Sequence, residues 1–143
     1  SCDVRILSKS ASFGLSEIDI GAFPAGGGTQ KLPRLIGMAR AKEMLFTGER
    51  ISAQDAYSMG IATRVVPDEE CLNEARKWAE KVASKSPSAI AAIKSLVNTG
   101  VNMDLNSALV FESETFGALS TRNDFKEGMS AFLEKRKPVY RGD

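Results

Sequence analysis

The stretch from Phe13 to Gly37 reads FGLSEIDIGAFPAGGGTQKLPRLIG. It places the carboxylate of Glu17 among mostly apolar residues, and the small-residue run 25–28 follows before a helical pattern. A carboxylate in an apolar setting can exchange protons near neutral pH. Glycines before a helix let another group approach backbone N–H donors closely. The two features together predict a site; the alternatives are an exposed turn residue at Glu17 and a tightly packed glycine turn.

Short apolar runs around this stretch predict strands in the first half of the chain. They lie at Val4–Leu7, Phe13–Leu15 and Ile61–Val66. Good helix formers and capping residues predict short helices between them, at 29–37, 39–47 and 52–59, with Ser52 opening a capping box. So few short strands cannot form a sheet of typical size alone.

From Asp68 onward the apolar periodicity is helical throughout. Ser86 and Pro87 predict a fresh helix start, and Thr121 and Asp124 predict the cap of a last helix that runs to about Arg136. Glu112 falls on the apolar stripe of the preceding helix, where we expect a paired structural acid rather than a catalyst. These wide apolar faces need partners, which favours an incomplete domain, an oligomer, or both.

The composition excludes several kinds of function. The 143 residues carry a net charge of +1, which gives no electrostatic reason to expect nucleic acid or a membrane surface as a partner. The chain has no histidine, so Ser-His-Asp catalysis and histidine-ligated metals are excluded within it. We expect no metal and no cofactor. Two cysteines, Cys2 and Cys71, favour a reducing compartment, so we expect a cytoplasmic protein, with the mitochondrial matrix as the alternative.

Several motifs, in a fixed order, resemble the crotonase superfamily, which is the enoyl-CoA hydratase/isomerase family. The first is the Phe13–Gly37 stretch. The others are LFTGERISAQDA at 45–56, MGIA at 59–62, VVP at 65–67 and EGMSAFLEKRKP at 127–138. The resemblance covers essentially the whole chain.

The resemblance implies an α/β fold, the crotonase-like spiral of β-β-α units, followed by a helical region that builds trimers and sometimes hexamers. This chain resembles the C-terminal half of that fold. Residues 1–66 would be the C-terminal part of the β/α core, and residues 67–143 the helical oligomerisation region. The partners it implies are an acyl-CoA substrate and either copies of the same chain or an N-terminal half.

The resemblance also assigns roles to residues. Glu17 matches the second of two hydratase glutamates and would act in general acid/base catalysis. Pro24, Ala25 and Gly26 would contact the substrate. Phe116 and Lys135 match positions that hold the adenine end of CoA from a neighbouring subunit; the alternatives for these two are a core stripe and a solvated tail.

Two further features of the family site would lie before Ser1. They are the first glutamate and the segments that supply two backbone N–H donors to the thioester oxygen. We therefore expect the 143 residues alone to be inactive. Three interpretations stay open: a part of an enoyl-CoA hydratase, an enoyl-CoA isomerase that uses Glu17 alone, and a non-catalytic oligomerisation module.

Overall fold

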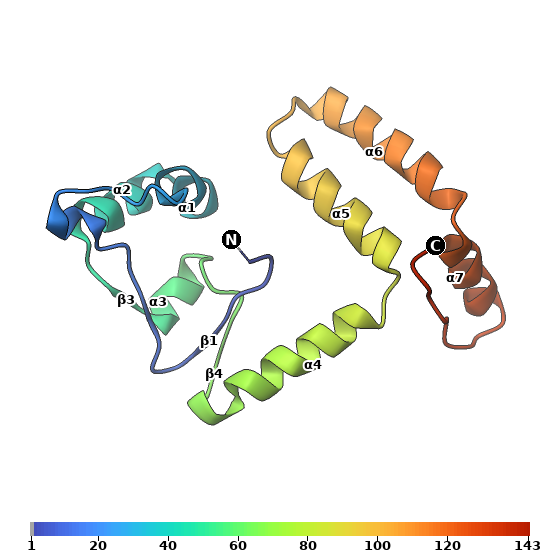
Figure 1. The fold of residues 1–143 in the computed structure, drawn as a ribbon, viewed down its shortest axis with the longest axis horizontal. Coiled ribbons are helices and arrows are strands. Elements are labelled where there is room, and N and C mark those ends of the chain that lie inside the picture. The colour runs from blue at the N-terminus through green and yellow to red at the C-terminus, as the bar shows by residue number, and fades with distance from the viewer. Residues whose placement is uncertain (1) are drawn as a thin grey trace. The chain divides into compact units, whose positions relative to one another are not determined.

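The computed structural model describes residues 2–143, and its elements are shown in Figure 1. The residue contacts divide the chain into two units, Ser1–Lys77 and Trp78–Asp143. The first unit contains the strands and the second is helical. The sequence-based division after residue 66, between the β/α core and the helical region, stays a prediction.

Two small strand pairs organise the first unit. The parallel pair joins β1 (Ile6–Ser8) to β4 (Arg64–Val66), and the antiparallel pair joins β2 (Ser12–Phe13) to β3 (Ile51–Ser52). The strands are shorter than the sequence predicts, and β3 is missing from the prediction altogether. The reason is that β1 and β2 find their partners far along the chain, and local periodicity carries no information about such pairing.

The short helices of this unit follow their local signals. They are η1 (Glu17–Ile20), α1 (Gly28–Ile36), α2 (Met38–Thr47) and α3 (Ala53–Ser58). Gly48 ends α2 with a left-handed backbone (φ 66°), the usual role of glycine after a helix. The Ser52 hydroxyl accepts a hydrogen bond from the Asp55 N–H, which confirms the predicted cap of α3.

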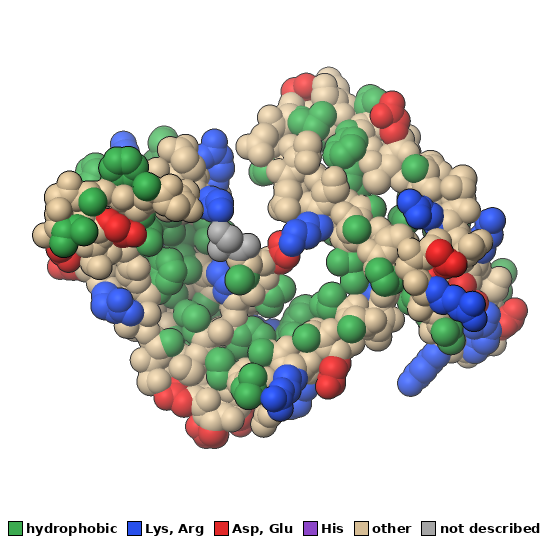
Figure 2. Space-filling view, viewed as in Figure 1, with side chains coloured by type: hydrophobic (Ala, Val, Ile, Leu, Met, Phe, Trp, Pro, Cys, Tyr) green, Lys and Arg blue, Asp and Glu red, His purple; other side chains and the backbone are tan. Residues whose placement is uncertain are grey.

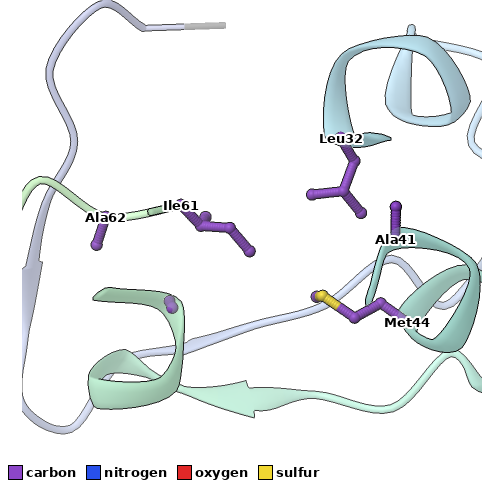
Figure 3. Packing of buried hydrophobic residues seen from close by; sticks show 6 residues of the cluster. Leu32, Ala41, Met44, Ile61 and Ala62 are labelled. Carbon is purple, nitrogen blue, oxygen red and sulfur yellow. The ribbon is translucent and has the colours of Figure 1, made fainter. Parts of the chain in front are cut away.

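The core of the first unit is small. It consists of Leu32, Ala41, Met44, Ala56, Ile61 and Ala62. Figure 3 shows Leu32 of α1, Met44 of α2 and Ile61 pointing toward one another. Ile61 and Ala62 lie in the turn before β4 rather than in the strand, because their backbone N–H groups both bond to the Ala56 carbonyl at the end of α3.

The later helices are η2 (Asp68–Glu70), α4 (Cys71–Ala83), α5 (Pro87–Gly100), α6 (Leu105–Ser120) and α7 (Asn123–Leu133). Helices α5 and α6 pack side by side, and α7 packs against the end of α6 (Figure 1). The predicted cap by Ser86 is confirmed, since its hydroxyl accepts from the Ala89 N–H.

The predicted cap of the last helix is wrong. Helix α7 begins after Arg122 with no side-chain cap, and it ends at Leu133 rather than near Arg136. Asp124 is instead buried, with 3% of its surface exposed, and accepts hydrogen bonds from the Ser86 hydroxyl and the backbone of Arg141. The position of Asp124 in the sequence is that of a helix cap, but its hydrogen bonds with Ser86 and Arg141, which lie far away in the sequence, give it a different role.

Many large hydrophobic side chains are exposed in both units (Figure 2). On the later helices they include Leu72, Ile93, Val97, Leu105, Val110 and Phe132. Glu112 is exposed as well, so its predicted pairing at a buried helix interface is not formed within this chain. Between residues 2 and 143, no helix is long and apolar enough to span a membrane.

Candidate functional site

Glu17 is the first residue of the 3-10 helix η1. Its carbonyl accepts a hydrogen bond from Ala22 N–H at 3.0 Å, and Gly21 closes the turn with φ 73°. Ile18, the next residue of η1, packs against Gly48 so closely that a Cβ on Gly48 would lie 2.9 Å from Ile18 Cγ2. The backbone around Glu17 is therefore fixed at both ends.

The carboxylate of Glu17 has an unusual environment. Among the described residues, its Oε2 is the one buried side-chain nitrogen or oxygen without a hydrogen-bond partner. A buried polar atom left without a partner costs free energy, so native proteins rarely keep one without a reason. A carboxylate with a buried oxygen that has no hydrogen-bond partner is suited to exchanging a proton with a bound molecule.

The glycine segment divides into two parts with different roles. Pro24 is buried, whereas Ala25 and Gly26 are exposed, and a Cβ on Gly26 would meet nothing within 4 Å. A Cβ on Gly28, by contrast, would lie 2.8 Å from Pro24 and 3.3 Å from Leu15. The alternative interpretation, a tightly packed glycine turn, therefore applies to Gly28. Beside Ala25 and Gly26 the backbone is open.

The two predicted CoA-binding residues lie in the second unit. Phe116 is 58% exposed on α6 and makes an edge-to-face contact with Phe125 of α7, with ring centroids 5.8 Å apart. Phe116 is thus not buried, although its place in the apolar stripe of this helix suggests a core residue. Lys135 is exposed and follows the end of α7 with φ 54°; no other non-glycine residue in the described part of the chain has a positive φ.

An ion pair that the sequence analysis missed flanks Lys135. The guanidinium of Arg136 donates to both carboxylate oxygens of Glu127 at 2.6 and 2.9 Å, and to Glu134 at 2.6 Å. Val139 N–H donates to Glu127 as well. The hydrogen bonds from Arg136 and Val139 lower the pKa of Glu127 to about 2. Nine residues separate Glu127 from Arg136, so no helical spacing could have signalled the pair.

Asp124 forms the second anchor of the chain's last segment. Burial raises the pKa of its carboxyl, but hydrogen bonds from Arg141 N–H, the Ser86 hydroxyl and Gly142 N–H outweigh this effect and hold the pKa below its usual value. Asp124 N–H also donates to the Asp143 carbonyl at 3.1 Å. The carboxylate stays charged and ties the C-terminal residues to α5 and α7.

The two cavities found in the second unit do not contain the predicted site residues. The larger, about 510 Å³, lies between α5 and α6 and is lined by Thr99, Met103, Val110, Phe111 and Glu114 among others. The smaller lies beside Asp124 and Tyr140. No cluster of potential metal ligands occurs among the described residues.

Known proteins resemble this chain over its full length. The family model described as enoyl-CoA hydratase/isomerase matches residues 1–143. The chain is 44% identical over 137 residues to the short-chain-enoyl-CoA hydratase of Clostridium acetobutylicum, covering 96% of this chain and 52% of that protein. It is 43% identical to the crotonyl-CoA hydratase of Syntrophomonas wolfei, covering 95% of this chain and 52% of the relative.

A solved structure agrees with these sequence matches. The crystal structure of enoyl-CoA hydratase from Bacillus anthracis superposes with a TM-score of 0.95 at 44% identity, covering 99% of this chain and 55% of the other. The chain thus spans about half the length of these relatives.

Proposed function

The chain belongs to the enoyl-CoA hydratase/isomerase family, and from that premise we propose that it forms part of an enzyme that hydrates trans-2-enoyl-CoA thioesters. The observation that carries this proposal is the Oε2 of Glu17, which is buried and has no hydrogen-bond partner among the described residues. Relatives named as short-chain-enoyl-CoA and crotonyl-CoA hydratases support the substrate class.

In the proposed reaction a water oxygen bonds to the β-carbon of the enoyl thioester and a proton is added to the α-carbon. The double bond is consumed and the elements of one water are gained. Glu17 supplies general acid/base catalysis, which is typically worth 10²–10⁴ in rate. Backbone N–H donors would stabilise the charge that develops on the thioester oxygen.

We propose that the 143 residues correspond to the C-terminal half of the family's domain. The backbone donors and the first glutamate would then come from a segment outside them. The half-length match to relatives supports the proposal that the chain is one half of that domain, and the exposed hydrophobic side chains of the helices support a missing partner. The same exposed faces support assembly into trimers or hexamers. The chain alone would be inactive, and a purely structural oligomerisation module is the competing interpretation.

The opposite, nucleotide end of the substrate is assigned to Phe116 and Lys135. Phe116 offers an exposed ring face for stacking, and Lys135 offers a charge to a phosphate. In the proposed assembly these residues serve a neighbouring subunit's CoA, as the family resemblance implies.

Ala25 favours a second candidate function. The family resemblance implies that hydratases commonly have glycine at this position, next to the catalytic water, and the methyl group of Ala25 would shift or crowd that water. Proton transfer between carbon atoms needs no such water. An enoyl-CoA isomerase that uses Glu17 alone to move a proton is therefore the second candidate.

Replacing Glu17 by glutamine tests the proposal. The variant Glu17→Gln keeps the shape of the side chain and removes its titrating proton. In the chain combined with a complementary N-terminal half, turnover of crotonyl-CoA should fall at least ~100-fold, while CoA still binds. Glu49→Gln, at an exposed acid of the same unit, should leave turnover unchanged. Near-normal turnover in Glu17→Gln would reject the assignment.

A further inference from the structure

Lys135 occupies a position that the backbone usually reserves for glycine. Helix α7 ends in a Schellman turn, in which Arg136 N–H donates to the Ala131 carbonyl at 3.0 Å and Lys135 takes the left-handed conformation between them. A side chain at this position costs backbone free energy that glycine would not. Such strained residues persist where the surrounding structure fixes them, and they cluster at ligand sites.

The surroundings of Lys135 do fix it. Arg136, the next residue, is held by both oxygens of Glu127, and its Nε bonds to Glu134 on the other side of Lys135. The same Glu127 accepts from Val139 N–H at 2.8 Å. The residues before and after Lys135 are thus tied together, while its own ammonium group is left exposed.

We propose that the Glu127–Arg136 ion pair is a positioning device that holds the Lys135 ammonium group ready to bind a phosphate of CoA. The inference rests on the proposed function, because it concerns the nucleotide end of the same substrate. The charge of Arg136 is neutralised by Glu127 and Glu134, and these ion pairs stabilise the turn. Lys135 then provides the positive charge that binds the ligand. Figure 2 shows Lys and Arg side chains on the surface around α7, with Asp and Glu side chains among them.

The simpler alternative is that Lys135 only stabilises the helix. A cation near a helix C-terminus interacts favourably with the helix dipole. The variant Lys135→Gly distinguishes ligand binding from helix stabilisation, because it keeps the left-handed turn and removes the ammonium group. Relief of backbone strain should leave this variant at least as stable as the wild type, so that a change in ligand binding cannot be ascribed to unfolding.

The test compares two thioesters in the chain combined with a complementary N-terminal half. Crotonyl-CoA carries the nucleotide phosphates, and crotonyl-pantetheine lacks them. We expect Lys135→Gly and Glu127→Gln to raise the KM for crotonyl-CoA about fivefold, the scale of one charge contact. Their kcat and their KM for crotonyl-pantetheine should stay unchanged. Glu112→Gln, which removes an exposed carboxylate of the same unit, should change neither substrate's KM.

Each result decides the matter. An unchanged KM for crotonyl-CoA in Glu127→Gln, or an equal loss on both thioesters, overturns the positioning role. A loss of stability in Lys135→Gly with unchanged KM values assigns Lys135 to the helix alone. If the wild-type combination turns over neither thioester, the proposed function fails and the inference that rests on it falls too. Calorimetric titration with CoA gives the same comparison of variants without turnover.

Discussion

Replacing Gly28 by alanine tests how the glycine segment is packed. Gly28 begins α1 with an ordinary helical backbone, where a change from glycine to alanine usually stabilises a protein by about 0.4–1 kcal/mol. Here the new Cβ would lie 2.8 Å from both Cβ and Cγ of Pro24, and 3.3 Å from Leu15 Cδ1. Pro24 is buried and its ring is rigid, so the clash cannot be relieved by a rotamer change.

Gly28→Ala should therefore destabilise the chain, whereas a change from glycine to alanine in a helix usually stabilises it. Overpacking typically costs about 1–3 kcal/mol, and subtracting the usual gain leaves a net loss of roughly 1–2 kcal/mol. For a chain of this size such a loss lowers Tm by roughly 3–10 °C. Thermal and urea unfolding of the 143-residue chain measure it.

Gly26→Ala is the matched control, because it makes the same chemical change two residues away. Its Cβ would meet nothing within 4 Å, and its backbone is not left-handed. Stability should stay equal or rise slightly. A Gly28→Ala variant as stable as Gly26→Ala, or more stable than the wild type, would refute the close packing of Gly28 on Pro24.

Three other predictions concern the helical unit. Asp124→Asn should lower Tm, because an amide nitrogen would face Gly142 N–H and leave that donor unpaired; unfolding followed by circular dichroism measures this, and an unchanged Tm would contradict the anchoring role. The wild-type chain should also lose stability as the pH falls from about 4.5 toward 2. The folded-state pKa of Glu127 is lowered by its hydrogen bonds with Arg136, so its contribution is complete above the unfolded-state value and disappears on protonation. In Glu127→Gln this part of the acid dependence should be reduced, and an unaltered pH profile would argue against it. Finally, light scattering should detect trimers or larger assemblies, since the apolar faces of α5 and α6 are exposed; a well-folded monomer at all concentrations would contradict assembly.

Local signals in the sequence predicted the features that depend on neighbouring residues. Ser52 and Ser86 cap helices because their partners lie three residues away. Gly48 ends α2 through its own left-handed backbone conformation, which depends on no distant residue.

Features that depend on distant residues could not be predicted in this way. The strand β3 forms only because β2 lies beside it, and Asp124 finds Ser86 38 residues back rather than capping its own helix. The left-handed backbone of Lys135 was also missed, because glycine is the residue that normally signals it. The substrate assignments of Pro24, Ala25, Gly26, Phe116 and Lys135 stay predictions until binding is measured.

The most direct test of the account is a crotonyl-CoA hydration assay on the 143-residue chain, with and without the separately expressed N-terminal half of the Clostridium acetobutylicum relative. Losing one preorganised donor to the thioester oxygen typically costs 10²–10³ in rate, so we expect no measurable hydration from the chain alone. Activity should appear on mixing and disappear again with Glu17→Gln. Robust hydration by the chain alone, or activity of the mixture that does not depend on Glu17, would contradict the account.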